Sequence, residues 1–344
     1  MTRRPLALCA VALLALTACG SAPEAQTAAS TVTVTNCGTP SSFPSPAKKM
    51  FVNDGNLISL VLALGAHEQI VAVSSLQRDA ATLKRHYGNA VDGLKQVAPE
   101  YPSRETVLAQ RPDVMVAGWS YGYAEDRQLT PATLRQQNVA PYILTESCRQ
   151  QDGKAARGIV EPWQALREDL GNLGKITGRE TEAAKVVADL DTRLKALREA
   201  PKPAKPPVVF LFDSGTDTVF SSGRFGAPEA VLDAAGARNA LSDVDDTWTR
   251  VSWERVAAAS PDAFLFVDYP PQSQAEKVAL LKARSGIREL PAVKENRFLN
   301  LPYAMWTSGP LNVDAAEQVR KALEGWGLVP ASGVTPKFDD RVSG

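Results

Sequence analysis

The strongest constraint on the fold is a segment that occurs twice. The chain of 344 residues reads SRETVLAQRPD from Ser103 and SWERVAAASPD from Ser252, with the same residue at six of eleven positions. An apolar run follows each copy, at residues 114–117 and 263–267. In both copies Ser is placed to cap a helix, Glu lies in the first helical turn, and Pro ends the helix before a buried strand. The repetition indicates two similar α/β lobes.

A second pair of segments supports this interpretation. LVLALGA at residues 60–66 and VLDAAGA at residues 231–237 are both helical tails stopped by a glycine. The two pairs of segments are separated by different numbers of residues, so the halves differ by insertions and do not form a short tandem repeat. Two matches in the same order favour duplication of a whole lobe.

Strand-like runs alternate with helical patterns along both halves, which predicts parallel sheets covered by helices. The clearest runs are residues 70–74, 114–117, 208–212, 263–267 and 297–301. Between the halves, residues 160–200 carry two apolar stripes at helical spacing, with Gly178 as a candidate break. We expect an N-terminal Rossmann-like lobe over 46–159, an interlobe helix over 160–200, a C-terminal Rossmann-like lobe over 201–330, and a tail over 331–344. The ligand cleft is expected between the lobes.

The N-terminus has the pattern of an export signal. Two arginines precede an apolar run at residues 6–16, and the letters LTAC end at Cys19. This order is typical of a secretory signal peptide, and LTAC is similar to the bacterial lipobox. We expect a lipoprotein signal peptide over 1–18, an acylated Cys19, and a flexible tether within 19–45, which together would anchor the protein to the extracytoplasmic face of the cell membrane. An ordinary signal peptide with an incidental cysteine is the alternative.

Cysteine usage is consistent with export. Cys9 would leave with the signal peptide and Cys19 would carry lipid, so Cys37 and Cys148 remain. In an oxidising compartment we expect this pair to form a disulfide. Two free buried thiols are the alternative.

Composition excludes several classes of function. Lys plus Arg and Asp plus Glu both number 38, which gives none of the basic excess that nucleic-acid binding needs. The only histidines, His67 and His86, are too few for a typical site for a divalent metal ion. We therefore expect no nucleic-acid partner, no metal site, no cofactor, and a monomer.

Aromatic residues follow the predicted strands of both halves. Ligands of α/β proteins bind beyond the carboxyl ends of strands, where such rings form a stackable cleft. The candidates are Trp119, Tyr121, Tyr123, Arg224, Phe225, Trp248, Tyr269, Tyr303 and Trp306. The alternative for several of these rings is an ordinary core position.

The layout resembles the extracytoplasmic substrate-binding lipoproteins of ABC importers for ferric siderophores, cobalamin and haem, the class with a helical backbone. The resemblance covers about residues 45–330. It is carried by the lipobox and by NLISLVLALGAHEQIVAVS, PSRETVLAQRPDVMVAGWSYG, FSSGRFGAPEAVLDAAGARN, WTRVSWERVAAASPDAFLFVD and LNLPYAMWTSGPLNVDAAEQV. It implies a receptor that captures a metal chelate, most often a ferric siderophore, and delivers it to an ABC-transporter permease dimer without catalysing a reaction.

The resemblance also assigns two acidic residues. In this family a Glu at the start of the repeated helix of each lobe forms a salt bridge with arginines of the permease. The matching residues in this chain are Glu105 and Glu254. The helix dipole alone would explain each Glu singly. The predicted cleft loops carry both basic and acidic residues, namely Arg78, Arg85 and Arg224 against Asp54, Glu125, Asp213, Asp217 and Asp268. This mixture favours a near-neutral chelate, such as a ferric hydroxamate, or a corrinoid, over a triply anionic iron–catecholate. A corrinoid or haem receptor remains the alternative.

One motif points to an enzyme. Residues 118–122 match G-x-S-x-G after a strand, the nucleophile elbow of α/β hydrolases, with Ser120 as the nucleophile. Those enzymes need a histidine after the serine, and none follows His86. The segment after Ser120 also reads as a loop, whereas the elbow needs a helix. We expect no enzymatic activity and keep a secreted esterase as a distant alternative.

Overall fold

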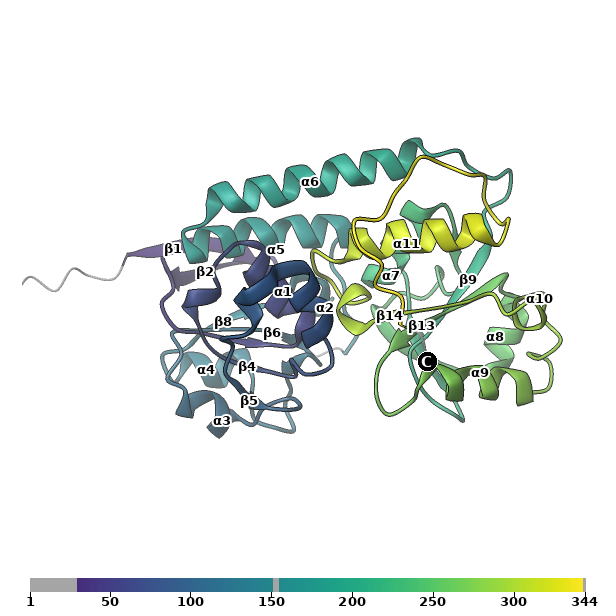
Figure 1. Ribbon diagram of the computed structural model, residues 1–344. Helices are drawn as coiled ribbons and strands as arrows, with labels where there is room; N and C mark the ends of the chain where they lie inside the picture. The colour runs from purple at the N-terminus through teal and green to yellow at the C-terminus, as the bar shows by residue number, and fades with distance from the viewer. Residues whose placement is uncertain (1–29, 151–154, 343–344) are drawn as a thin grey trace, which may run out of the picture.

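The computed structural model describes residues 30–150 and 155–342. The predicted signal peptide, Cys19 and the first part of the tether lie outside the described residues. Two α/β lobes lie side by side, and two helices run along one side of the molecule (Figure 1). Among the helices described, none is both long enough and apolar enough to cross a membrane.

The N-terminal lobe contains a parallel sheet in the order β5-β4-β3-β6-β8, with the short β7 beside the end of β6. Its strands are β3 (Met50–Asn53), β4 (Ile70–Ser74), β5 (Gln96–Ala98), β6 (Val114–Trp119), β7 (Gly122–Tyr123) and β8 (Ala140–Ile143). Its helices are α1 (Gly55–Ala63), α2 (Ala80–Tyr87), α3 (Arg104–Ala109) and α4 (Pro131–Arg135).

The C-terminal lobe contains a parallel sheet in the order β11-β9-β13-β14 and a separate antiparallel pair, β10-β12. Its strands are β9 (Val208–Phe212), β10 (Val219–Ser222), β11 (Arg238–Asn239), β12 (Trp248–Val251), β13 (Ala263–Asp268) and β14 (Phe298–Pro302). Its helices are α7 (Ala227–Ala235), α8 (Trp253–Ala259), α9 (Gln274–Ala283), α10 (Pro291–Lys294) and α11 (Asn312–Gly325).

The two lobes share one order of elements. In each, a first strand (β3 or β9) is followed by a helix that leads to the neighbouring strand on one side (β4 or β11). The repeated Ser-x-Glu helix (α3 or α8) then leads to the strand on the other side (β6 or β13). The central strands are buried along their length, as a parallel sheet with both faces covered requires. The prediction of two α/β lobes with parallel sheets is confirmed.

The segment between the lobes is helical, but it forms two helices, whereas we expected one. α5 (Pro162–Thr177) ends at Gly178, which has a left-handed backbone with φ of 68°, and α6 (Glu180–Glu199) runs back alongside it. Close approach is possible because Gly174 has no side chain, and a Cβ there would lie 2.7 Å from the Cβ of Ala183. α6 then continues to the C-terminal lobe, where it contacts α7 and α11.

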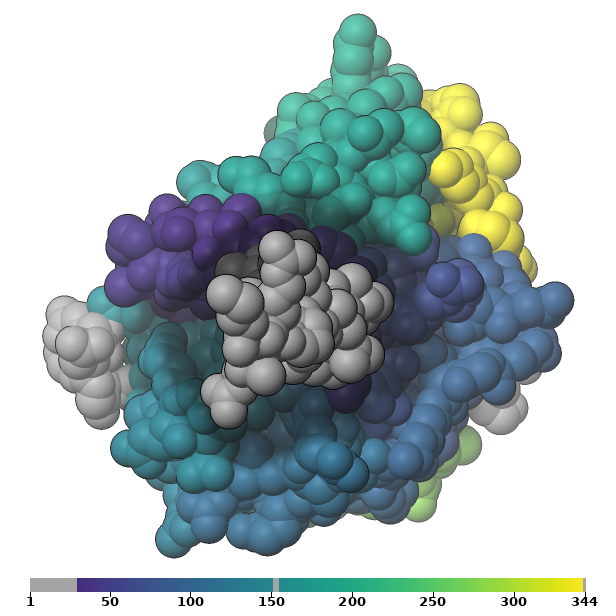
Figure 2. All heavy atoms as spheres, turned by 90° about the vertical axis from the view of Figure 1, so that its left-hand side faces the viewer, coloured from purple at the N-terminus to yellow at the C-terminus, as the bar shows by residue number. Residues whose placement is uncertain are grey.

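Part of the predicted tether is folded, so this expectation was wrong for residues 30–45. Strands β1 (Thr31–Asn36) and β2 (Thr39–Pro44) form an antiparallel hairpin that lies against the N-terminal lobe (Figure 2). The alternation of Thr and Val in β1 favours a strand, and Val34 and Phe43 are buried. The turn places Cys37 next to Cys148, and a disulfide of 1.95 Å joins them. The pairing of these two cysteines is thus the one predicted.

The C-terminal segment packs onto both lobes. Asp340 is buried, and its carboxylate lies 2.6 Å from the Nη1 of Arg85 and 3.0 Å from the Nε2 of His86, both in α2 of the N-terminal lobe. The same carboxylate accepts a hydrogen bond from Gln318 of α11 in the C-terminal lobe. Arg85, which we had considered as a cation near the cleft, and His86 therefore belong to a contact between the lobes. We call residues 336–342 the C-terminal strap.

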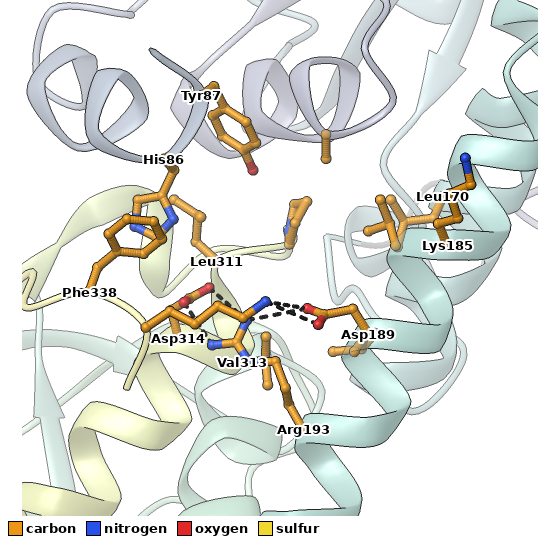
Figure 3. Close-up of a pocket in the computed structure, with 15 residues that line it drawn as sticks. His86, Tyr87, Leu170, Lys185, Asp189, Arg193, Leu311, Val313, Asp314 and Phe338 are labelled. Atoms are coloured by element: carbon orange, nitrogen blue, oxygen red, sulfur yellow. Dashed lines mark hydrogen bonds and ion pairs between the residues drawn. The ribbon is translucent and has the colours of Figure 1, made fainter. Parts of the chain in front are cut away.

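A hollow of about 320 Å³ lies beside this strap, between α2, α6 and the start of α11 (Figure 3). Phe338 of the strap forms part of its wall and packs on His86, with 4.2 Å between ring centres. Four charged groups in its wall are paired: Arg193 binds Asp314 at 2.7 Å, and Lys337 binds Asp189 at 2.9 Å. These ion pairs connect α6 to α11 and to the strap, and so hold the helical side of the molecule together.

Candidate interlobe ligand site

The carboxyl ends of the strands of both lobes lead into the interface between the lobes. Asp54 follows β3 and Arg78 follows β4 in the N-terminal lobe, while Tyr269 follows β13 and Tyr303 follows β14 in the C-terminal lobe. Side chains from strands of two different sheets thus meet at one place, which is where α/β folds bind ligands.

Asp54 is the centre of this meeting point. It is buried, and its carboxylate accepts hydrogen bonds from the hydroxyls of Tyr303 at 3.1 Å and Tyr101 at 3.2 Å. The guanidinium of Arg78 lies 3.4 Å from the same carboxylate. Burial raises the pKa of Asp54, and the charge of Arg78 and the tyrosine hydroxyls oppose that rise. Contacts from both lobes therefore converge on one carboxylate.

Arg78 also connects the aromatic rings. Its guanidinium lies 4.6 Å from the ring centre of Tyr269 and 5.1 Å from that of Tyr303. The two rings are themselves 5.1 Å apart. A cation over two tyrosine faces next to a carboxylate is a compact polar and aromatic surface that can contact a ligand by stacking and by hydrogen bonds.

A second aromatic group lies along the same interface. In the N-terminal lobe, the guanidinium of Arg149 lies 3.7 Å above the ring of Trp119 and pairs with Glu125 at 2.7 Å. In the C-terminal lobe, Trp248 packs on Phe220, with 5.8 Å between ring centres. Each lobe thus has a tryptophan at the end of a strand beside the interface.

The lobes are joined firmly between these aromatic groups. The carboxylate of Asp79 accepts a hydrogen bond of 3.0 Å from the backbone N–H of Ala304, and that of Glu146 accepts one of 2.8 Å from Ser308. Asn56 donates to the carbonyl of Ser308 at 2.8 Å. Burial raises the pKa of both Asp79 and Glu146 to about 7. Together with Asp54, which binds the Tyr303 hydroxyl, four side chains of the N-terminal lobe therefore hold residues 303–308 of the C-terminal lobe.

Some buried polar atoms at this interface lack a partner within the described part of the chain. They include the hydroxyl of Tyr121, Oδ2 of Asp79 and Nε of Arg78. Buried polar groups in folded proteins are nearly always hydrogen-bonded, so such atoms mark a place where a ligand or water supplies partners.

Two predicted ligand contacts are core residues. Tyr123 is fully buried, and its hydroxyl donates to the carbonyls of Met115 and Tyr142. Trp306 is also fully buried, and its indole N–H donates to the carbonyl of Phe266 at 3.2 Å. Because neither ring has surface to offer a ligand, these two assignments were wrong.

The remaining candidates divide into two groups. Trp119, Tyr121, Trp248, Tyr269 and Tyr303 lie at the interface described above. Arg224 and Phe225 lie farther along the seam between the lobes. Arg224 pairs with Asp245 at 2.6 Å, and Phe225 packs against Gly158.

Tyr101, Arg149 and Arg157 were missed by the sequence analysis, and Asp54 and Arg78 were noted only as charged residues in loops. Tyr101 follows β5, but that strand has only three residues and gives no recognisable pattern. Asp54 and Arg78 directly follow strands, so the strand-end rule could have placed them in the site. Arg149 and Arg157 lie in irregular segments and pair with each other only through an isolated β-bridge, and nothing in the sequence distinguishes them.

Ser120 has one property of a nucleophile elbow, because it is exposed and its φ is +64°. However, the two-residue strand β7 follows it, where the elbow needs a helix. His86 is bound to Asp340, and His67 lies in a short 3-10 turn before β4. Across residues 30–150 and 155–342, no group of three or more His, Cys, Asp or Glu is arranged to hold a metal ion.

Glu105 and Glu254 occupy equivalent positions in the two lobes. Both are exposed in the first turn of their helices, α3 and α8, whose N-caps are Ser103 and Ser252. Hydrogen bonds to the helix start lower the pKa of both carboxyls, so both are charged at neutral pH. In Figure 1 the two helices lie in different lobes, both on the side of the molecule away from α6.

Two α/β lobes with a polar and aromatic interface between them define a class of solute-binding receptors. Residues 54–304 match the family described as "Periplasmic binding protein", and the chain belongs to this family. Its members are extracytoplasmic receptors that bind small-molecule ligands and work with ABC transporters.

Solved structures with the same fold include a periplasmic binding protein from Veillonella parvula, which is 23% identical with a TM-score of 0.70 over 86% of this chain and 98% of that one. A protein of an ABC-type Fe3+-hydroxamate transport system from Saccharomonospora viridis is 20% identical, with a TM-score of 0.68 over 85% and 98%. A periplasmic haem-binding protein from Pseudomonas aeruginosa is 23% identical, with a TM-score of 0.62 over 86% and 100%. At these identities the likeness concerns the fold.

Proposed function

We propose that this protein captures a metal chelate, a ferric siderophore of the hydroxamate type, and delivers it to an ABC-transporter permease. The observation that carries the proposal is the convergence of Arg78 and Tyr303 on Asp54 between the lobes, with the ring of Tyr269 beside Arg78 and Tyr303. A bulky chelate with polar edges and apolar faces fits a surface that combines stacking rings, an arginine and unpartnered polar atoms.

Charge at the interface supports a near-neutral ligand. Four arginines along the interface are paired with carboxylates, so that each of these four cations is balanced by an anion. The pairs are Arg78–Asp54, Arg149–Glu125, Arg157–Asp246 and Arg224–Asp245. A triply anionic iron–catecholate would need a net basic surface, whereas a neutral ferric trihydroxamate would not.

Anchoring and docking complete the proposal. Acylated Cys19 would hold the receptor on the extracytoplasmic face of the membrane, as a monomer. Glu105 and Glu254 would each contact one subunit of a permease dimer. Their exposure and their equivalent positions in two similar lobes support this role.

The test is a binding titration of the purified protein in which tryptophan fluorescence reports binding. The probes are a neutral ferric trihydroxamate, a ferric tris-catecholate, haemin and cyanocobalamin. We expect the trihydroxamate to bind at least about tenfold more tightly than the tris-catecholate. Tighter binding of haemin or cyanocobalamin would replace the hydroxamate with that ligand class, and binding of none of the four would contradict the proposal.

Two variants locate the binding surface. Trp119→Ala removes a ring at the lobe interface and should weaken binding about tenfold or more. Trp326 is a partly exposed tryptophan outside the interlobe site, in the wall of a hollow beside α11 and the strap. Trp326→Ala should therefore leave the affinity unchanged. Equal effects of the two substitutions would contradict a site between the lobes.

A further inference from the structure

Arg157 joins the two interface tryptophans through their backbones. It belongs to the N-terminal lobe, just before α5, and its side chain is only 10% exposed. Its guanidinium donates to the carbonyl of Trp119 at 3.3 Å and to the carbonyl of Trp248 at 3.0 Å. One side chain thus connects β6 of one lobe to β12 of the other.

Several contacts hold Arg157 in place. Its backbone N–H donates to the carboxylate of Asp246 at 3.1 Å, and its Nε lies 3.8 Å from the same carboxylate. The next residue, Gly158, donates to the carbonyl of Cys148, which the disulfide to Cys37 anchors. A side chain on Gly158 would collide with Phe225 of the other lobe, since a Cβ there would lie 2.3 Å from that of Phe225.

The geometry of the guanidinium explains why an arginine stands here. Its planar fork can donate to two carbonyls in different directions at once. A lysine keeps the charge, but its single ammonium on a flexible chain cannot reproduce two donors held at fixed positions. The bond to each tryptophan carbonyl fixes the strand end from which that ring projects.

We infer that Arg157 is a positioning residue that holds Trp119 and Trp248 in the relative position that the ligand requires, and that it thereby sets which sizes of chelate are bound. This inference rests on the proposed function, because it assumes that a ligand binds between the two tryptophans. Arg157 acts through the backbone carbonyls of the two tryptophans.

The test compares Arg157→Lys with Arg297→Lys. Arg297 is a matched control, because its guanidinium also donates to a backbone carbonyl, that of Asp262, but entirely within the C-terminal lobe. Arg157→Lys should weaken binding of the preferred chelate about tenfold and reduce its preference over a smaller ferric hydroxamate, whereas Arg297→Lys should change neither. Equal affinity and equal preference in wild type and Arg157→Lys would overturn the inference.

A distance measurement tests the same point without a ligand. Spin labels on cysteines introduced at the exposed positions Asp126 and Lys282 report the separation of the lobes. Arg157→Lys should broaden the distribution of distances, and an unchanged distribution would count against a positioning role. If the wild type binds none of the chelates, the proposed function fails while the distance result still stands by itself.

Discussion

Asp79 occupies the N-cap position of α2, yet its side chain makes no bond to that helix. It accepts a hydrogen bond from Ala304 of the other lobe instead. The space beside it is available because Gly55 has no side chain, since a Cβ there would lie 2.1 Å from the Asp79 carboxylate. At the residue scale, then, the side chain of Asp79 joins the two lobes and does not cap its own helix. It is buried, and no cation forms an ion pair with it in the described part of the chain.

This arrangement predicts how stability depends on pH. Burial raises the pKa of Asp79 from 3.8 to about 7 and that of Glu146 to about 7, so the folded state holds protons that the unfolded state releases near pH 4. The free energy of unfolding should therefore fall as pH rises from about 4 to about 7 and then level off. Asp79→Asn should reduce this slope by about 1.4 kcal/mol per pH unit.

Urea unfolding at several pH values between 4.5 and 8 measures the slope. The control is Asp126→Asn, which changes an exposed aspartate whose carboxylate accepts a hydrogen bond from the neighbouring backbone N–H of Arg127. That variant should keep the slope of the wild type. A slope that Asp79→Asn leaves unchanged would show that Asp79 does not hold its proton in the folded state.

At the element scale, two segments outside the central sheets pack onto the lobes, namely the hairpin β1–β2 on the N-terminal lobe and the C-terminal strap on both lobes. The hairpin β1–β2 is tied to the N-terminal lobe by a disulfide and by the Asn36 side chain, which bonds to both backbone groups of Ile143. The strap connects α2 to α11 through Asp340. Burial alone would raise the pKa of Asp340, but the bonds from His86 and Arg85 hold it below its ordinary value.

The contacts of the strap lead to a prediction about stability, and a neighbouring residue in the strap provides the control. Asp340→Ala would leave Arg85, His86 and Gln318 without this carboxylate, and it should lower the free energy of unfolding by about 2–4 kcal/mol. Asp339 is the adjacent residue, but its carboxylate is exposed and pairs with Arg341. Asp339→Ala should therefore change stability by no more than about 0.5 kcal/mol in the same urea titration. Similar losses for the two variants would contradict a specific role for Asp340.

The disulfide should contribute a comparable amount. It joins residues separated by 111 positions, so it restricts a long loop of the unfolded chain. Replacing both Cys37 and Cys148 with Ser should lower the free energy of unfolding by about 2–5 kcal/mol. The wild type treated with a reductant should show a similar loss, and a reductant should have no effect on the double variant. If the reductant destabilised both proteins equally, the bond would not be the cause.

At the scale of the whole molecule, the two lobes differ in what surrounds their sheets but share the order of their elements. Equivalent helices α3 and α8 therefore carry equivalent acidic residues in their first turns. The joint at residues 303–308, the two helices α5 and α6, and the strap all connect the lobes. With so many connections, we expect ligand binding to change the angle between the lobes only slightly.

Glu105→Ala combined with Glu254→Ala tests docking. This double variant should bind the chelate with the affinity of the wild type, within about twofold, but should no longer support chelate uptake or stimulate the ATPase of its transporter. Glu68→Ala combined with Asp233→Ala is a control, since it also removes one exposed acid from each lobe. Normal transport by the Glu105 and Glu254 double variant would refute the assignment, and a loss of chelate binding would show that the residues serve another purpose.

Much of the fold could be predicted because its causes are local. The capping serines, the glycine at the end of α7 and the apolar runs that became β4, β6, β9, β13 and β14 each act over a few residues. The break falls at Gly178, the candidate that the sequence analysis named, and the strand β1 has an equally local signal in its Thr–Val alternation.

The sequence by itself determined the two α/β lobes, the cysteine pair and the acidic residue at the start of each repeated helix, because these features depend on neighbours in the chain or on a match between its halves. Only the tertiary structure decided which aromatic rings reach the interface. Tyr121 and Tyr123 are two residues apart, yet the first lies between the lobes and the second lies in the core. It also decided the roles of Arg157 and Asp340, because each contacts residues far away in the chain, and such contacts leave no periodic pattern in the sequence.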